Sequence, residues 1–490
     1  MKFCFEKRDF IELDIRPEAL ALAGSDRDLS WSEFKVEVDQ WHTAFVAKSW
    51  TKLGGPVIIY GHKNTTMVAA IYGCIRAGIP YIPIDVVYPK DRIASIIDIS
   101  KSQIIINTEA EKLGLGAMIE VASPRDITEH VGEVILDNNP NPNKLVYIIF
   151  TSGSTGAPKG VQISLEAILS FVRWMTSDFG FKEGSVFINS AIFSFDLSVF
   201  ELMTFSALGG TLLMNTKEQA ANPQTFLQRI HDYQGNIWVS TPSFALLFSK
   251  MPPATQLSRI SDFLFCGETL PHKLAQNLVS KYPTAAVWNT YGPTEATVAT
   301  TQIKITQSIL EKHNPLPVGN IKPECEIKIE DGEITIVGPH VSHGYVGLDA
   351  LNQEKFISVN GQRAFRTGDG GFFESELLFF TGRNDDLVKL HGYRIELNEI
   401  TANLELSPNV DTAATLALKR NGEVKKIVAF ITLKDTEHPF SRDQLSADLL
   451  NRIPPYMVPS DIRVIGQIPL NQNGKADKKV LLDMYLKKES

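Results

Sequence analysis

The sequence predicts an α/β protein with parallel-rich sheets in a large N-terminal domain and a small α+β domain after it. Short β-branched runs at residues 56–60, 103–107 and 146–150 alternate with helix-like segments, which is typical of parallel sheets joined by crossover helices. The last part of the chain carries strand and helix signals of its own. We therefore divide the chain into residues 1–384 and residues 385–490.

The elements follow in chain order. Thr65–Ala77 is a helix-like segment after the first β-branched run, and Leu165–Asp178 is one after the third. Around residues 324–346 the runs become short and alternating, and Asp331 is followed by glycine, a pair that favours a hairpin turn. A small distorted β-barrel is therefore expected at about 315–384. The runs KKIVAFITL and SADLLNRI then supply a strand and a helix for the last domain.

Composition narrows the range of functions. The chain has 490 residues, with 48 Lys and Arg against 56 Asp and Glu, and its net charge of −8 argues against nucleic acid as a partner. The four cysteines lie far apart and form no CxxC pair, so neither zinc nor disulfides are suggested and the cytoplasm is expected. No signal-peptide pattern is present, and no apolar run approaches the ~20 residues that span a bilayer, so membrane insertion is not expected.

A loop rich in glycine and hydroxyl groups follows the strand at 146–150. In YIIFTSGSTGAPKG, residues 147–160, glycines let backbone amides approach a phosphate and hydroxyls add further donors. The spacing is neither Walker A nor the dinucleotide GxGxxG. Taken alone, the loop could also be a flexible turn between a strand and a helix. Its candidate nucleotide-binding residues are Thr151, Ser152, Gly153, Ser154, Thr155, Gly156 and Lys159.

Ten motifs occur in the order found in the adenylate-forming superfamily, which includes acyl-CoA synthetases, luciferases and adenylation domains of nonribosomal peptide synthetases. They are LSWSEF at 29–34, RAGIPYIPIDVVYPKDRI at 76–93, the loop at 147–160, FDLS at 195–198, NTYGPTEATV at 289–298, GEITIVG at 332–338, FRTGD at 365–369, GRNDDLVKLHGYRIELNEI at 382–400, PPYMVP at 454–459 and NQNGKADKK at 471–479. The chain thus resembles this superfamily over nearly its whole length. The resemblance implies an ATP-dependent, AMP-forming ligase that requires Mg²⁺.

The motif NTYGPTE is expected to hold the nucleotide. The ring of Tyr291, followed by Gly292, offers a flat surface for adenine, and the amide of Asn289 can pair with a base edge. The resemblance implies that Thr294 contacts the α-phosphate. It also implies that Glu295 holds Mg²⁺, a role that suits a hard carboxylate.

The resemblance assigns further roles to polar residues near the end of the chain. Asp369 and Arg383 match residues that contact the ribose, and Lys475 matches the lysine that reaches the substrate carboxylate and the α-phosphate. Asp385 falls at the hinge about which the C-terminal domain rotates between the two half-reactions, although Asp386 beside it could serve instead.

Asp196 in FSFDLSVF is the residue expected to distinguish an amino-acid substrate from a carboxylic acid without an amino group. A carboxylate in a small apolar pocket needs a cation, and the ammonium of an amino acid is a natural partner, whereas the alternative is a helix-capping aspartate. By analogy with peptide-synthetase domains, the side-chain pocket should be lined by Leu197, Phe200, Ser240, Leu264, Cys266, Thr290, Val298 and Ala299.

Within the superfamily, FSFDLSV, STPSFALL, FLFCGETLP, NTYGPTEATVATT and SHGYVG resemble the ligases that load D-alanine for the D-alanylation of lipoteichoic acid. That resemblance implies that Cys266 favours the D enantiomer and that the acceptor is the phosphopantetheine thiol of a separate carrier protein, since no carrier domain follows. Phe200 is bulkier than the side chain expected at its position, and the region at residues 320–338 is shorter than in typical members of that family. These two departures leave open a stand-alone adenylation enzyme of a nonribosomal peptide or polyketide pathway that loads glycine, L-alanine or another small amino acid. An acyl-CoA synthetase is a further alternative, against which Asp196 argues.

Overall fold

The computed structural model describes residues 13, 16–47, 55–115, 119–126, 144–153, 156–249, 255–383, 387–420, 423–434, 440–470 and 476–487. The chain divides into two units. The first consists of Met1–Val86, Ile99–Ile149 and Gly160–Gly382, and the second consists of Val87–Asp98, Phe150–Lys159 and Arg383–Ser490. The second unit therefore includes the glycine-rich loop as well as the C-terminal part of the chain.

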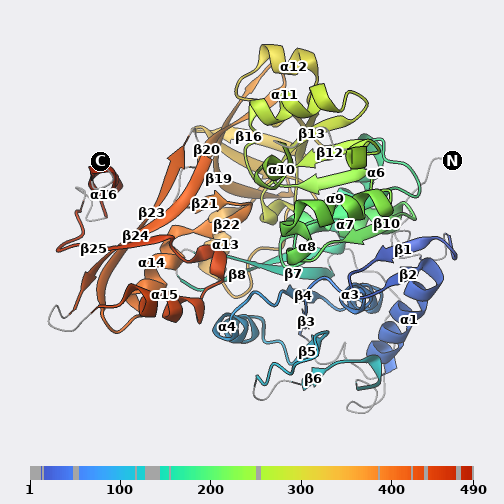
Figure 1. Ribbon diagram of the computed structural model, residues 1–490, viewed down its shortest axis with the longest axis horizontal. Helices are drawn as coiled ribbons and strands as arrows, with labels where there is room; N and C mark the ends of the chain where they lie inside the picture. The colour runs from blue at the N-terminus through green and yellow to red at the C-terminus, as the bar shows by residue number, and fades with distance from the viewer. Residues whose placement is uncertain are drawn as a thin grey trace. The chain divides into compact units, whose positions relative to one another are not determined.

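Within the described residues, the largest sheet of the first unit has nine strands. Their order is β15 (Asn320–Ile321), β14 (Thr301–Lys304), β13 (Ala286–Tyr291), β12 (Asp262–Phe265), β11 (Ile237–Ser240), β9 (Val186–Asn189), β10 (Thr211–Met214), β1 (Leu20–Ala23) and β2 (Asp28–Ser30). The strands from β13 to β1 run parallel to their neighbours. The carboxyl ends of β11, β12 and β13 therefore lie side by side at one edge of the sheet (Figure 1).

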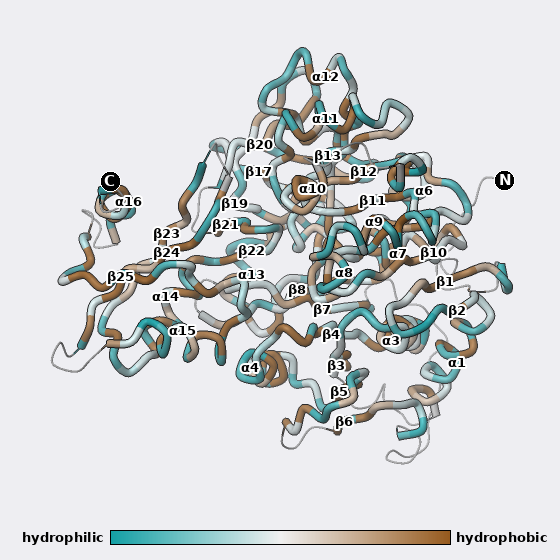
Figure 2. The backbone as a smooth tube through the Cα atoms, viewed as in Figure 1, coloured by the Kyte–Doolittle hydropathy of each residue, from teal (hydrophilic) through white to brown (hydrophobic). Residues whose placement is uncertain are grey.

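A second sheet has six strands, in the order β6 (Ile119–Val121), β5 (Ile104–Asn107), β3 (Val57–Tyr60), β4 (Tyr81–Ile84), β7 (Leu145–Thr151) and β8 (Lys159–Ser164). The three β-branched runs of the sequence are β3, β5 and β7, and the ladders β3–β5, β3–β4 and β4–β7 are parallel as predicted. Figure 2 shows β3 in the hydrophobic colour, which fits a strand buried between two neighbours.

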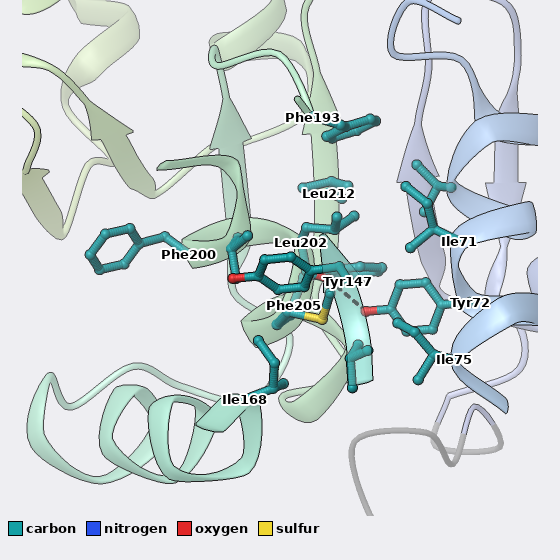
Figure 3. Packing of buried hydrophobic residues seen from close by; sticks show 14 of the residues in the cluster. Ile71, Tyr72, Ile75, Tyr147, Ile168, Phe193, Phe200, Leu202, Phe205 and Leu212 are labelled. Carbon is teal, nitrogen blue, oxygen red and sulfur yellow. Dashed lines mark hydrogen bonds between the residues drawn. The ribbon is translucent and has the colours of Figure 1, made fainter. Parts of the chain in front are cut away.

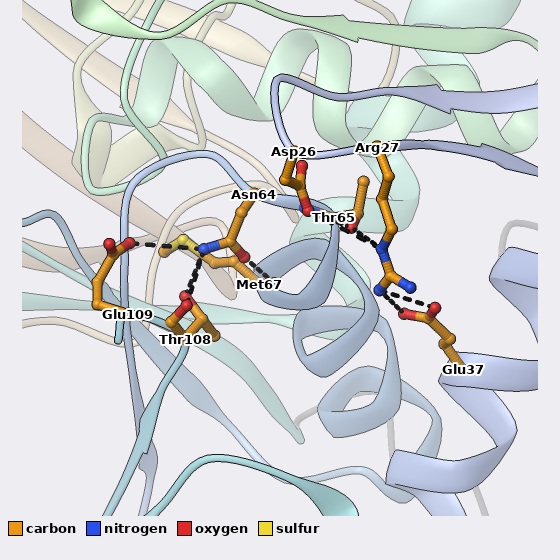
Figure 4. A network of polar contacts seen from close by, with 8 residues as sticks. All are labelled: Asp26, Arg27, Glu37, Asn64, Thr65, Met67, Thr108 and Glu109. Carbon is orange, nitrogen blue, oxygen red and sulfur yellow. Dashed lines mark hydrogen bonds and ion pairs between the residues drawn. The ribbon is translucent and has the colours of Figure 1, made fainter. Parts of the chain in front are cut away.

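The described helices before residue 383 are α1 (Trp31–Ala47), α3 (Thr65–Ala77), α4 (Lys90–Ser100), α6 (Leu165–Asp178), α7 (Val199–Ala207), α8 (Lys217–Ala221), α9 (Pro223–Asp232), α10 (Pro242–Ser249), α11 (His272–Lys281), α12 (Gln307–Lys312) and α13 (Asp349–Lys355). The two helix-like segments of the sequence are α3 and α6. Asn64 caps α3 by accepting from the backbone N–H of Met67 and donates to Thr108, as Figure 4 shows. In the part of the chain that the structure describes, no helix is long and apolar enough to cross a membrane.

Two hydrophobic cores cover the two faces of the nine-stranded sheet. Val239 and Leu264 belong to the first core, whereas their chain neighbours Trp238 and Phe263 belong to the second. This alternation follows from the two-residue period of a strand. Figure 3 shows part of the first core, in which Tyr147 lies among aromatic and aliphatic residues of α3 and α7.

The stretch after β15 forms an antiparallel sheet with the strands β16 (Glu326–Glu330), β17 (Glu333–Val337), β19 (Gln362–Glu374), β18 (Phe356–Val359) and β20 (Leu377–Arg383). Asp331 and Gly332 both have positive φ, 50° and 79°, at the turn between β16 and β17. The Asp-Gly hairpin predicted from the sequence is confirmed.

The C-terminal part of the second unit is an α+β arrangement, as predicted. It contains the hairpin β21 (Leu387–Leu390) and β22 (Tyr393–Glu396), the sheet β23 (Val410–Arg420), β24 (Glu423–Leu433) and β25 (Asp461–Val464), and the helices α14 (Leu397–Glu405), α15 (Arg442–Leu450) and α16 (Lys478–Lys487). The run KKIVAFITL lies in β24, and SADLLNRI begins within α15.

Candidate active site

Several residues predicted to bind the substrate come together at the carboxyl ends of β11, β12 and β13. The register places Ser240 beside Phe265 and Phe265 beside Asn289. Thr290 Oγ1 donates to the backbone carbonyl of Phe265 at 2.9 Å, so it fastens β13 to β12. In parallel α/β sheets, this edge is where ligands bind.

The apolar members of the predicted pocket share one core. Leu197, Phe200, Leu264, Cys266, Val298 and Ala299 all belong to the first hydrophobic core. Phe200, which Figure 3 labels, is fully buried. Its ring meets Phe171 edge to face at a centroid distance of 5.2 Å. Ser240 is committed to its own strand end, because its hydroxyl accepts from Trp238 Nε1 at 2.8 Å and donates to the carbonyl of Thr241 at 3.0 Å.

Asp196 opens the 3-10 helix η2 (Asp196–Ser198), and only 9% of its surface is exposed. Phe195 and Ser198 hold the N-cap positions of η2 and of α7, so Asp196 is not the N-cap residue of either helix. Burial, and then the charges of Tyr81 and Asp196, raise the pKa of Tyr147 well above its usual value. The carboxylate of Asp196 therefore lies near the first core, and such a group can compensate the charge of a cationic ligand.

Tyr291 and Asp369 are far apart in the sequence but adjacent in the structure. Both are buried, and Tyr291 Oη donates to Asp369 Oδ2 at 2.6 Å. This contact joins the end of β13 to β19. Asn289 Nδ2 donates to the carbonyl of Pro317 at 2.7 Å, so its amide nitrogen is engaged within the protein.

Glu295 lies in the 3-10 helix η4 (Thr294–Ala296), directly after β13. Its side chain is fully buried and accepts a hydrogen bond from Tyr345 Oη at 2.7 Å. No role was predicted for Tyr345, although the stretch SHGYVG contains it. Gly292 allows the loop to close on itself, because a Cβ there would lie 2.5 Å from the Cα of Ala299.

The surroundings of Glu295 suit Mg²⁺ only with ligands from outside the protein. Among the described residues, no group of three or more His, Cys, Asp or Glu side chains is placed to hold a metal ion. Mg²⁺ commonly uses one or two protein carboxylates and takes its other ligands from water and substrate phosphates. Glu295 therefore fits an ion that binds together with a nucleotide.

The glycine-rich loop belongs to the second unit. Ser152 Oγ accepts from the backbone N–H of Glu396 at 2.9 Å, and the backbone N–H of Gly153 donates to Glu399 Oε2 at 2.9 Å. Lys159 Nζ lies 3.1 Å from Glu396 Oε1, and both side chains are buried. Amide and ammonium groups of the loop thus bind carboxylate oxygens, and the same donors suit phosphate oxygens. The sequence did not indicate either glutamate as a partner of the loop.

The loop joins two strands, so the alternative of a turn between a strand and a helix is wrong. Thr151 ends β7, Lys159 begins β8, and α6 starts only after β8. Gly156 has a φ of 88°, a conformation that favours glycine. Arg383 is the last residue of β20. Other predicted residues, Ser154, Thr155, Asp385, Asp386 and Lys475, lie outside the described part of the chain.

Comparison with protein families gives two matches. The model of the AMP-binding enzyme family matches residues 12–346, and the model of the AMP-binding enzyme C-terminal domain matches residues 399–475. Together they cover both the loop at 147–160 and the segment that carries Lys475.

Curated relatives are similar over nearly the whole chain. A D-alanine–D-alanyl carrier protein ligase of Bacillus licheniformis is 40% identical over 489 residues, covering 95% of this chain and 96% of the relative. A ligase of the same name from Bacillus mycoides is 36% identical over 494 residues, with the same coverage.

Solved structures are similar in fold. The o-succinylbenzoate CoA synthetase of Bacillus subtilis has a TM-score of 0.84 at 20% identity, covering 97% of this chain and 98% of that chain. The Vibrio cholerae adenylation domain AlmE, solved with glycyl-adenosine-5'-phosphate, has a TM-score of 0.83 at 20% identity, covering 99% of each chain. The α/β fold predicted from the sequence is confirmed.

Proposed function

We propose that this chain, which belongs to the AMP-binding enzyme family, activates D-alanine with ATP and passes it to the phosphopantetheine thiol of a separate carrier protein. The chain is an ATP-dependent, AMP-forming ligase. The observation that carries the choice of substrate is the 40% identity, over 95% of the chain, to a ligase named for D-alanine and its carrier. A cytoplasmic site of action, where ATP is available, belongs to the same proposal.

In the first half-reaction, the carboxylate of the amino acid attacks the α-phosphorus of ATP, and pyrophosphate leaves. We assign the ammonium of the substrate to Asp196, because the resemblance places this aspartate where amino-acid-activating members of the family carry one, and a carboxylate can compensate the charge of an ammonium group. The methyl group of D-alanine then faces the apolar residues of the first core, with Cys266 and Val298 among them. Lys475 is assigned to the reacting carboxylate and α-phosphate.

The nucleotide is assigned to residues that the motifs indicate. Tyr291 offers its ring to adenine, and Asp369 accepts from the ribose hydroxyls with Arg383 as a second ribose contact. The loop at 151–159 takes the phosphates, and its present contacts with two carboxylates support an affinity for anions. Thr294 is assigned to the α-phosphate.

Mg²⁺, held by Glu295 and by phosphate oxygens, would neutralise charge on the phosphates when bound. Tyr345 orients the Glu295 carboxylate for that role through its hydroxyl group. In the second half-reaction, the carrier thiol attacks the carbonyl carbon of the adenylate, and AMP leaves. Rotation of the C-terminal domain about Asp385 or Asp386 is proposed to separate the two half-reactions.

The test is amino-acid-dependent ATP–pyrophosphate exchange with D-alanine, L-alanine, glycine and propionate. D-alanine should support the fastest exchange, and mass spectrometry should then detect alanylation of a phosphopantetheinylated carrier protein. Preference for L-alanine or glycine would assign the enzyme to another amino acid. Preference for propionate would overturn the role of Asp196.

A matched pair of variants isolates that role. Asp196→Asn should lose most exchange with D-alanine, by about a hundredfold in kcat/KM, because the neutral amide no longer compensates the ammonium. Asp178→Asn is the control, since Asp178 is an exposed residue at the end of α6. Equal activity of both variants would contradict the assignment.

A further inference from the structure

The loop that follows β13 holds two consecutive β-branched residues in the left-handed region of backbone conformation. Thr297 has a φ of 51° and Val298 a φ of 69°. This region is uncommon for any residue except glycine, and it is least favourable for β-branched side chains. Such a conformation is strained for these residues, so the surrounding structure must hold the loop in place.

His340 contacts this loop at two points. Its backbone carbonyl accepts from Thr297 Oγ1 at 2.7 Å, and its ring Nε2 lies 2.9 Å from Thr300 Oγ1. Its other ring nitrogen, Nδ1, lies 3.1 Å from Cys325 Sγ. The imidazole is fully buried, so both ring nitrogens have protein partners in the interior.

The protonation state of the imidazole suits these contacts. Burial, and then the charge of Lys322, lower the pKa of His340 well below its usual value. A neutral imidazole has one donor nitrogen and one acceptor nitrogen, and a hydroxyl or thiol can take either role. Both hydrogen bonds of the ring can therefore be satisfied at neutral pH.

The same strained loop carries residues of the proposed site. Glu295 lies two residues before Thr297, and its backbone carbonyl accepts from the N–H of Ser342 at 2.8 Å. Cys266 Sγ lies 3.8 Å from the carbonyl oxygen of Val298. A change in the backbone at 297 and 298 would therefore move the proposed metal ligand and one wall of the amino-acid site together.

The segment that contains His340 is itself anchored to β8. The backbone N–H of His343 donates to the carbonyl of Gln162 at 2.9 Å, and that of Val346 donates to the carbonyl of Gly160 at 2.9 Å. The segment from 340 to 346 thus ties the loop after β13 to the strand that leaves the phosphate loop. Its anchorage makes it a rigid support for the strained loop.

We propose that His340 is a positioning residue. Its backbone carbonyl, bound to Thr297, and its ring, bound to Thr300, hold Thr297 and Val298 in the left-handed conformation and so place Glu295 and Val298 for adenylation. The inference rests on the proposed function of these residues. It adds a residue that contacts neither the amino acid nor the nucleotide and acts through the backbone of the loop.

Substitutions at Thr297 test this inference without disturbing the imidazole. Thr297→Val keeps the shape and the strain but removes the hydrogen bond to His340, so kcat/KM should fall about tenfold. Thr297→Ser keeps the hydroxyl and should retain most activity. Thr297→Gly should lose less activity than Thr297→Val, because glycine adopts a positive φ without strain. Thr176→Val, a half-buried threonine of α6, is the control.

Substitutions at His340 and Thr300 provide the second arm. His340→Ala and Thr300→Val should each raise KM for the amino acid or MgATP about tenfold. The double variant should lose no more than the more severe single variant, because the two groups share one bond. His340→Gln keeps a polar group near Nε2 and should recover part of the loss. His272→Ala, whose half-buried ring contacts the carbonyl of Leu310, is the control.

The outcomes are judged by steady-state ATP–pyrophosphate exchange alongside thermal unfolding. A loss of activity that follows the melting temperature, with Thr297→Gly the worst variant, would overturn the positioning role and leave a purely structural one. Unchanged kinetics in Thr297→Val would also overturn it. The exchange is run with whichever acid wild type activates best, so an error in the proposed substrate is detected in wild type, separately from the comparison of variants.

Discussion

Buried carboxylates show how far single residues could be predicted. The motifs indicated Asp196, Glu295 and Asp369, and all three are buried in the structure. Their partners could not be predicted, because Tyr345 lies 50 residues from Glu295 and Tyr291 lies 78 residues from Asp369. A motif records residue types and spacing within one segment, whereas these hydrogen bonds depend on how distant segments fold together.

The hydroxyl of Tyr345 should matter for the metal-dependent step. Tyr345→Phe leaves Glu295 without one donor in a fully buried setting, so the Mg²⁺ concentration needed for half-maximal exchange should change by about tenfold. The measurement is a Mg²⁺ titration of ATP–pyrophosphate exchange. Tyr233→Phe is a matched control, because Tyr233 donates to the exposed Asp28 at 3.0 Å. Equal Mg²⁺ requirements in the two variants would contradict the role.

Lys63 should give the stability of the protein a dependence on alkaline pH. It is buried, and Nζ donates to the carbonyl of Ser190 at 2.8 Å. Burial lowers the pKa of Lys63 to about 7, although Asp85 and Glu201 act in the opposite direction. Between about pH 7 and 10.5 the unfolded chain then binds more protons at this residue than the folded chain does. The free energy of unfolding therefore rises with pH across this range, and the gain is lost as pH falls back through it.

Comparison with Lys63→Met isolates this effect. Between about pH 7 and pH 9, wild type should gain free energy of unfolding relative to the variant, by at most about 1.4 kcal/mol per pH unit. Urea unfolding at several pH values measures it. Lys35→Met is the control, because Lys35 forms a solvent-accessible ion pair with Asp39 at 2.8 Å. Parallel pH curves for wild type and Lys63→Met would show that Lys63 keeps its proton.

At the scale of elements, the sequence predicted the helices whose ends depend on side chains next to them in the chain. The ranges Thr65–Ala77 and Leu165–Asp178 match α3 and α6, and the side chains of Asn64 and Ser164 cap them. The β-branched runs became strands because they are buried in parallel ladders. The extra strand after the phosphate loop was missed, because KGVQIS is short and its pairing with β7 is a property of the sheet.

The cap of α3 should contribute more than an isolated cap. Asn64→Ala removes both the bond from the Met67 N–H and the bond to Thr108 Oγ1, so it should lower the free energy of unfolding by about 2 kcal/mol. Thr306→Ala, at the cap of the short helix α12, should cost about 1 kcal/mol. Urea unfolding compares them. A larger loss in Thr306→Ala would contradict the role of the Thr108 contact.

At the scale of the whole molecule, the order of motifs predicted the fold class and family because it samples nearly the entire chain. The segments that make up the second unit could not be predicted in the same way. It includes Phe150–Lys159, because the loop's donors bind carboxylates of residues more than two hundred positions away. Contacts at that separation leave no periodic trace in the sequence.

Nucleotide binding should appear in the stability of the folded protein. A ligand that binds only the native state raises the free energy of unfolding by about 2.7 kcal/mol at a concentration of 100 times its Kd. MgATP should therefore raise the melting temperature of wild type, and Asp369→Asn should reduce that shift because it weakens the proposed ribose contact beside Tyr291. Asp28→Asn is the control at an exposed tyrosine–aspartate pair. AMP without Mg²⁺ should still stabilise Glu295→Gln, since the ribose site is intact in that variant, whereas MgATP should stabilise it less than wild type. An equal MgATP shift in Asp369→Asn and wild type would place the ribose elsewhere.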